Sequence, residues 1–292
     1  MLNRLPFLIA AMALTCAGAL SAASFPTDFQ KAVRLYRTPG KAAEAEAAFL
    51  ELAARKVRHS QATDAAMEKA SLCALRRKDF EEAEKRAGRI REESLQTLCR
   101  MRIWEAQRRR ADIVRVLGEQ NIKTWPDRLI YDAAMCRGKA YSIQGNAAAE
   151  KDFLLARTCT FDTRELAFAN LALGRFYQGH ARDEDKALAA YREVAGSSVR
   201  GSVKYEGVIA YAVLLAARGK GREALEQLDE LSVETIPHPD WRCRIHRAYG
   251  DVYAALNRPA DALASYRKAI AVPDASEYLV RAIREKIATL AP

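Results

Sequence analysis

Small and bulky residues recur at helical spacing in the segment from residue 246 to residue 270. Gly250 and Tyr253 fall on one face of a first amphipathic stretch, and Tyr266 falls on the inner face of a second. Residues 257–259, between the two stretches, contain an asparagine and a proline and are typical of a turn. The pattern predicts two antiparallel helices in which small residues of one face bulky residues of the other, so that the helices approach closely.

The same arrangement recurs along most of the chain. Three further copies place small residues at matching positions of both helices, two weaker copies lie upstream, and an aberrant copy around Trp104 and Ile113 lacks the small residues. In chain order the five matching copies carry Leu35, Gly40, Ala45 and Phe49; Ala70, Cys73, Ala83 and Ala87; Gly138, Tyr141, Gly145, Ala149 and Phe153 or Leu154; Leu173, Gly174, Tyr177, Ala187 and Tyr191; and Ala212, Leu215, Gly219, Ala224 and Leu228.

The alanines of the second helices set the period. Ala45, Ala83, Ala149, Ala187, Ala224 and Ala262 are separated by 38, 66, 38, 37 and 38 residues, and the gap of 66 leaves room for one shortened copy. We therefore predict about seven helical hairpins. A last helix, residues 276–290, has apolar residues on one face only and is expected to cap the array. Strand patterns are nearly absent, so the predicted fold class is all-α.

The clearest copy resembles a tetratricopeptide repeat. The resemblance rests on Gly250, Tyr253, Ala262, Tyr266, Ala269 and Pro273, while the copy with Leu173, Gly174, Tyr177, Gly179, Lys186 and Ala187 also has Sel1-like features. It implies a right-handed α-solenoid over residues 24–292, with the likeliest break at residues 119–127. Stacked repeats share one core, so we expect a single domain.

The resemblance also implies a function. Such arrays present their first helices along a groove that takes up a peptide or a partner helix, which makes the expected activity non-enzymatic binding by a scaffold or adaptor. Helical spacing projects five polar residues of first helices into that groove. They are Lys139, Arg175, Gln178, Arg244 and Arg247. The identity of a protein or peptide partner does not follow, and association of the array with itself stays open.

The N-terminus has the layout of a secretory signal peptide. Arg4 precedes an apolar run to Leu20, which ends in the small residues Ser21, Ala22 and Ala23. The run is shorter than the roughly 20 residues that span a bilayer, so we predict cleavage after Ala22 or Ala23 and export to the periplasm or beyond. Ala13, Leu14 and Thr15 before Cys16 disfavour a lipoprotein. The expected place is the bacterial cell envelope.

The chain is strongly basic, with a formal net charge of +10. Its densest cationic cluster falls in the aberrant copy and comprises Arg100, Arg102, Arg108, Arg109 and Arg110. A basic surface could bind an anionic envelope polymer or a lipid, which is the alternative function, although arginines on exposed helices are often only solvated. Export argues against nucleic acid as the ligand.

Motifs for catalysis or cofactors do not stand out. The sequence has no phosphate-binding loop of the Gly-x-x-x-x-Gly-Lys type and no His-Glu-x-x-His. Cys243 and His246 lie three residues apart on one helix, but packing accounts for them better than metal binding, so we expect neither metal nor cofactor. Cys136 and Cys159 fall at the adjoining ends of two helices of one hairpin, where a disulfide is plausible.

Overall fold

The computed structural model describes residues 19–55 and 60–290. The predicted signal peptide of residues 1–23 therefore lies outside the described residues, apart from the backbone of 19–23, which begins the first helix. Within residues 19–55 and 60–290, no helix is both long and apolar enough to cross a membrane.

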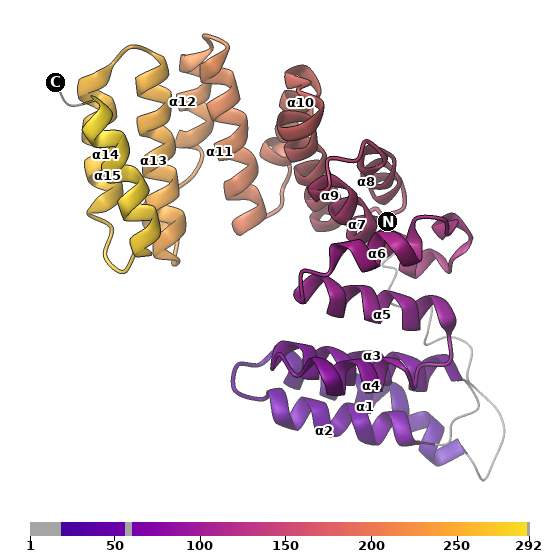
Figure 1. The fold of residues 1–292 in the computed structure, drawn as a ribbon. Coiled ribbons are helices and arrows are strands. Elements are labelled where there is room, and N and C mark those ends of the chain that lie inside the picture. Colours follow the sequence, from indigo (N-terminus) through magenta and orange to yellow (C-terminus); the bar gives the residue numbers. More distant parts are fainter. Residues whose placement is uncertain (1–18, 56–59, 291–292) are drawn as a thin grey trace. The chain divides into compact units, whose positions relative to one another are not determined.

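The described part of the chain consists of fifteen α-helices and contains no strand, which confirms the all-α prediction (Figure 1). In chain order they are α1 (Ala19–Arg37), α2 (Ala42–Ala54), α3 (Ser60–Arg76), α4 (Phe80–Ala87), α5 (Glu93–Ala106), α6 (Arg110–Leu117), α7 (Asp127–Ile143), α8 (Ala148–Thr158), α9 (Thr163–Phe176), α10 (Glu184–Gly196), α11 (Ser202–Ala217), α12 (Gly221–Asp229), α13 (Pro239–Ala255), α14 (Pro259–Ile270) and α15 (Glu277–Leu290). Shorter turns η2 (Ile122–Thr124), η3 (Tyr177–Ala181) and η4 (Val233–Thr235) lie between them.

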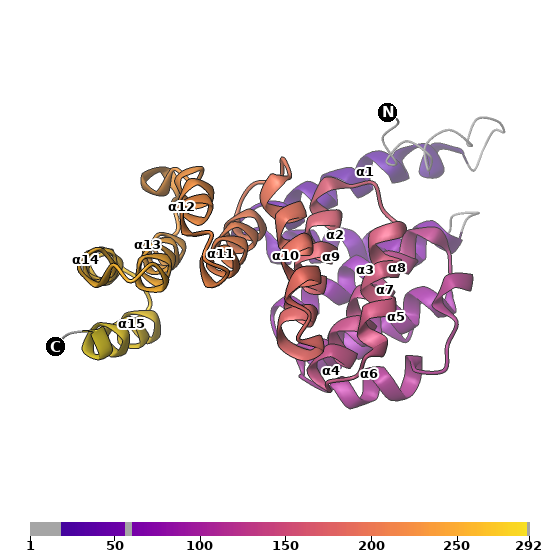
Figure 2. The same cartoon turned by 90° about the horizontal axis from the view of Figure 1, so that it is seen from above.

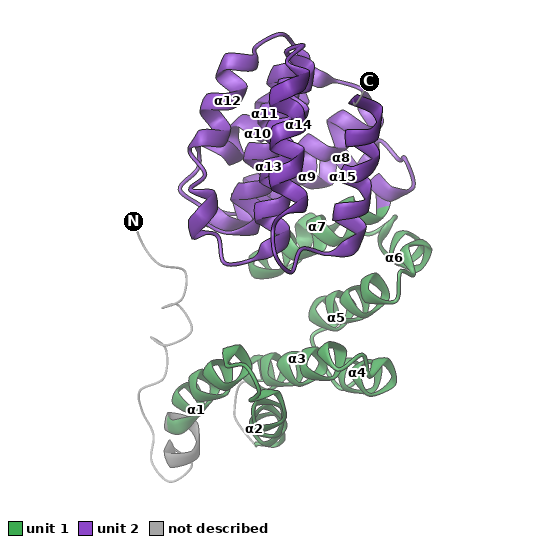
Figure 3. Cartoon of the chain, turned by 90° about the vertical axis from the view of Figure 1, so that its left-hand side faces the viewer, with its two compact units in different colours: residues 1–140 green, residues 141–292 purple. Residues whose placement is uncertain are grey.

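The chain divides into two compact units, residues 1–140 and residues 141–292 (Figure 3). The division falls inside α7, so the predicted break at residues 119–127 is not the boundary between the units. Hydrogen bonds tie the first part of α7 to the helices before it: Arg137 donates to the carbonyl oxygens of Leu117 and Gln120, each at 2.8 Å. Such contacts assign the first part of α7 to unit 1.

Within each unit the helices pack as consecutive hairpins. We call the odd-numbered helices α1 to α13 first helices and the even-numbered helices second helices. In unit 1, α1 packs on α2, α3 on α4, and α5 on α6; in unit 2, α9 packs on α10, α11 on α12, and α13 on α14. Successive first helices also touch, as α9 does α11 and α11 does α13, and α15 covers the last hairpin (Figures 1 and 2). The expected helical-repeat array and its capping helix are confirmed.

A left-handed residue marks the turn of every hairpin. The positive φ angles between first and second helices belong to Gly40, Lys78, Arg108, Gly145, Arg182, Gly219 and Asn257. Seven such turns match the predicted number of hairpins. Only glycine adopts this conformation without a steric cost, so the lysine and the two arginines gave no sequence signal for it.

The alanines that define the predicted repeat period lie in the buried core. The six alanines that set it are all fully buried, and Ile113 occupies the corresponding place in α6, where it is buried too. Two glycines pack directly against a tyrosine ring of the partner helix in the same hairpin. A Cβ added at Gly250 would lie less than 3.0 Å from three ring carbons of Tyr266, and one added at Gly174 would meet Tyr191 in the same way. The predicted packing of small against bulky residues is therefore confirmed.

Candidate functional site

The five predicted groove residues lie on or next to the first helices α7, α9 and α13. Lys139, on the part of α7 that belongs to unit 1, is the only one of the five in that unit. Its Nζ lies 3.4 Å from Oε1 of Glu105 on α5, and half of the side chain is exposed. This cation is therefore already joined to the preceding first helix.

Arg175 and Gln178 belong to the hairpin of α9 and α10. Arg175 donates from Nε to Oε1 of Glu206 on α11 at 2.9 Å, and its Nη2 contacts the same oxygen. The Arg175 side chain is nevertheless 59% exposed. Gln178 accepts a hydrogen bond of 3.0 Å from the hydroxyl of buried Tyr191, which fixes the amide beside the seam. Both residues are exposed, and Arg175 carries the charge that a partner could contact.

Arg244 and Arg247 lie on α13 and face α15 and the rest of α13. Arg244 donates to the hydroxyl of Tyr278 at 2.7 Å and also lies over the ring of Trp241. Arg247 Nε is 3.8 Å from Asp251 Oδ2 and has no hydrogen-bond partner among the described residues. Asp251 in turn accepts from Tyr266 and from Lys286 of α15.

These contacts share a pattern that the sequence analysis missed. An arginine or lysine of one first helix meets an acceptor about one repeat away, on the neighbouring first helix or on α15. The opposite charges at such separations were visible in the sequence, but their contact depends on how the hairpins stack. Any carboxylate of a partner must compete with these internal acceptors, and charge-assisted bonds to arginine are the strongest of them.

The predicted basic cluster does not form one surface. Arg102 of α5 is only 22% exposed and donates to Glu68 at 2.6 Å and to Asp132 at 2.7 Å. Burial alone would lower the pKa of Arg102, but the two carboxylates outweigh burial and raise it. Arg102 is therefore an internal link between α3, α5 and α7, and it does not share an exposed surface with the other arginines of the predicted cluster.

The other members of the cluster are more accessible but scattered. Arg100 Nε lies 3.6 Å from a carboxylate oxygen of Glu84, and Arg109 donates to Asp112 at 2.8 Å. Arg108 forms the left-handed turn between α5 and α6, and Arg110 begins α6. Arg100 thus links α5 to the preceding hairpin, while Arg109 pairs within the first turn of α6.

The cysteine candidates Cys136 and Cys243 have packing roles. Cys136 is buried, carries a free thiol and donates from Sγ to Glu105 Oε2 at 3.6 Å, so the predicted bridge to Cys159 is not formed in this structure. Burial raises the pKa of Cys136 to about 12. Cys243 packs in the core with Tyr266. Among the residues that the structure describes, no three histidine, cysteine or acidic side chains converge as a metal site would need.

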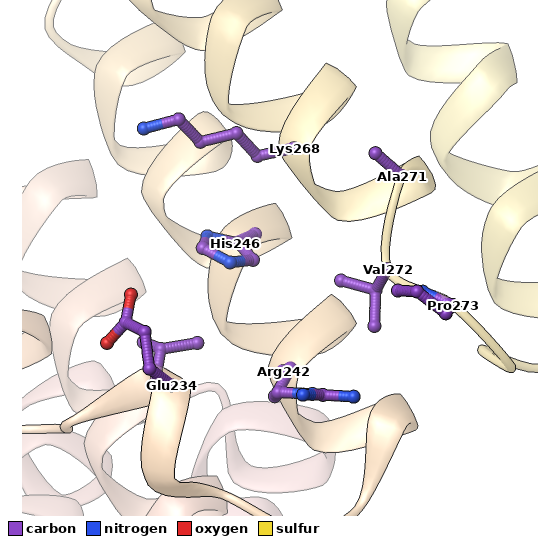
Figure 4. A pocket seen from close by; sticks show the side chains of 8 residues that line it. Glu234, Arg242, His246, Lys268, Ala271, Val272 and Pro273 are labelled. Carbon is purple, nitrogen blue, oxygen red and sulfur yellow. The ribbon is translucent and has the colours of Figure 1, made fainter.

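Two open crevices lie between first and second helices in unit 2. One, of about 370 Å³, is bordered by α13, the end of α14 and η4 (Figure 4). Its polar lining consists of Glu234, Arg242, His246 and Lys268. The other, of about 410 Å³, lies between α9 and α10 and includes Asn170, whose buried Oδ1 has no hydrogen-bond partner among the described residues. Sequence reasoning predicted neither crevice.

The comparisons with known proteins do not show a family for this chain. No family model and no curated protein matches the chain. A crystal structure of a tetratricopeptide repeat protein from Parabacteroides merdae ATCC 43184 is similar to it, at 16% sequence identity and a TM-score of 0.48, over 92% of this chain and 99% of that one.

Proposed function

We propose that this protein is a non-enzymatic scaffold that binds a protein or peptide through the exposed faces of its first helices. The observation that carries the proposal is Arg175. It lies one residue after the seam glycine of α9, where the first helix leaves the core, and its guanidinium is largely exposed although it touches Glu206. A partner carboxylate could take up the donors of Arg175 that Glu206 does not use, since guanidinium offers five donors in a planar fork.

The same position recurs in the stacked hairpins, which suits recognition of an extended partner. Within unit 2, Arg175 follows Gly174 in α9 as Asp251 follows Gly250 in α13. Repeats that stack along one axis present such positions at regular intervals, and extended segments bind well to surfaces of that kind. The partner we propose is therefore an extended segment that carries an acidic group.

The proposal includes the bacterial cell envelope as the place of action. It rests on the apolar N-terminal run and the small residues that follow it, and it is tested separately from binding. Fractionation of cells that produce the tagged full-length chain should recover a processed form outside the cytoplasm. N-terminal sequencing of that form should begin at Ala23 or Ser24. Recovery of only the full-length chain in the cytoplasm would refute export.

The binding proposal is tested by capture from the envelope fraction after mild crosslinking. The wild type is compared with Arg175→Glu, which reverses the exposed charge and places it beside Glu206. The matched control is Arg222→Glu on α12, whose side chain is 94% exposed and contacts only Glu226 among the described residues. Both variants change the net charge equally, so only the position of the charge differs.

The outcomes separate the two functions considered. A protein captured by the wild type and by Arg222→Glu, but not by Arg175→Glu, supports the scaffold. An equal loss in both variants, with recovery of anionic polymer or lipid and sensitivity to salt, supports the basic-surface alternative instead. Capture of the same protein by all three would exclude Arg175 as the contact.

A further inference from the structure

The crevice at α13 and α14 occupies a place that three other hairpins fill with apolar side chains, whereas in α9 the buried Asn170 stands there and lines the second crevice. His246 lies four residues before Gly250, the small seam residue of α13. The residues at this position in α3, α7 and α11 are Ala66, Ala134 and Val208, and all three are fully buried. A half-buried imidazole at this position instead lines an open crevice.

The ionisable side chains of the crevice have no hydrogen-bond or ion-pair partner among the described residues, although ion pairs are common elsewhere in the described chain. They belong to Arg242, His246, Lys268 and Glu234. Arg242 Nε is buried as well as unbonded. A buried donor without a partner costs about 1–3 kcal/mol, so the site gains if a ligand supplies an acceptor.

The charges of the crevice favour a single anion. Arg242 and Lys268 carry two positive charges against the one negative charge of Glu234. Burial first, and then the nearby Lys268, lower the pKa of His246, so that imidazole is neutral near pH 7. A monoanion therefore neutralises the lining, whereas a doubly charged anion would require protonation of His246.

The remaining wall is apolar. Val233, Ala271, Val272 and Pro273 line the crevice beside the charged groups, and Figure 4 shows Val272 and Pro273 above Arg242. Apolar surface of this kind stabilises a hydrocarbon group by about 25 cal/mol per Å² of area removed from water. We propose that this crevice binds a carboxylate carried on an apolar body. The proposal is independent of the scaffold function, which rests on Arg175 of α9.

The test titrates full-length protein with sodium hexanoate, followed by the NMR signals of the His246 ring, which His246→Gln identifies. We expect a saturable shift by about 20 mM, and a loss of affinity of about tenfold or more in Arg242→Gln and in Lys268→Gln. Arg267→Gln is the matched control, because it removes the same charge from the neighbouring residue of α14, outside the crevice. Glu234→Gln should bind more tightly, because a repelling carboxylate is gone.

Two further probes separate the features of the ligand. Hexanamide keeps the apolar body without the charge and should bind at least several-fold more weakly. Sodium phosphate keeps the charge without the body and should also be weaker. Absence of a saturable hexanoate shift, equal binding of hexanamide, or an equal loss in Arg267→Gln and Lys268→Gln would overturn the proposal. Tighter binding of phosphate than of hexanoate would overturn the carboxylate assignment.

The proposal also gives a pH dependence. Lys268 from α14, Glu234 from η4 and Arg242 from α13 itself are the charged groups that line the crevice with His246. A bound carboxylate favours protonated imidazole, so by linkage hexanoate should bind more tightly as the pH falls from about 7.5 to about 6. His246→Gln, which cannot be protonated, should lose this dependence. A wild-type affinity that does not change over this range would contradict the role given to His246.

Discussion

The seam between Gly250 and Tyr266 offers the sharpest test of the fold. Replacing Gly250 by alanine adds one methyl group, whose carbon would lie less than 3.0 Å from three carbons of the Tyr266 ring. The ring is buried, and its hydroxyl donates to Asp251 at 2.7 Å, so it cannot swing aside without losing that bond. The two helices must therefore separate or the ring must shift.

The expected magnitude is a balance of two terms. Alanine is favoured over glycine inside a helix by about 1 kcal/mol. Overpacking of a close contact costs about 1–3 kcal/mol. Gly196, at the end of α10, has no atom within 4 Å of an added Cβ, so Gly196→Ala keeps only the favourable term. We expect Gly250→Ala to be less stable than Gly196→Ala by about 1–3 kcal/mol in the free energy of unfolding.

The assay is urea unfolding followed by circular dichroism, with hydrogen exchange of peptides from α13 and α14. Hydrogen exchange is needed because repeat arrays can unfold in parts, so the urea curve need not report one two-state transition. A difference of 1 kcal/mol corresponds to about 2–4 °C in Tm for a domain of 150–250 residues. Equal stability of the two variants, with unchanged exchange in α13, would show that the seam is loose and that the repeat register is wrong.

Three further predictions follow from buried polar groups. Burial alone would raise the pKa of Glu68, but Lys69 and Arg102 outweigh burial and lower it. The charged Glu68 therefore stabilises the fold above the unfolded pKa of about 4.3, and this stabilisation is lost as the pH falls through the folded pKa. Glu68→Gln should accordingly show a smaller drop in the urea midpoint between pH 5 and about pH 3 than the wild type. Asp240 accepts hydrogen bonds from the backbone N–H and the hydroxyl of Ser276, at 2.7 and 2.6 Å. Asp240→Ala should therefore destabilise the start of α15 by about 1–3 kcal/mol and speed its amide exchange. The control Glu285→Ala, at an exposed position, should change stability by less than about 0.5 kcal/mol. Burial raises the pKa of both Cys99 and Cys136 to about 12, so neither should react with iodoacetamide at about pH 8 until urea is added, and reaction of folded Cys136 would contradict its burial.

The candidate site was only partly predictable. Helical spacing predicted that Arg175 projects away from the seam glycine beside it, and its side chain is 59% exposed. It did not reveal Glu206, 31 residues away, as the acceptor of Arg175. The internal role of Arg102 was not predicted for the same reason, since its partners Glu68 and Asp132 lie 34 and 30 residues away, on α3 and α7.

The sequence by itself determined the helices, their pairing and the number of hairpins, because these depend on spacings of a few residues and on a period of about 38 residues, both of which are local. Tertiary structure decided which charges meet, where the compact units divide within α7, and that the place of His246 is a crevice while Val208 is buried at the same repeat position. Those outcomes depend on distances between side chains of different helices, which the packing of large and small residues sets and which no short-range pattern encodes.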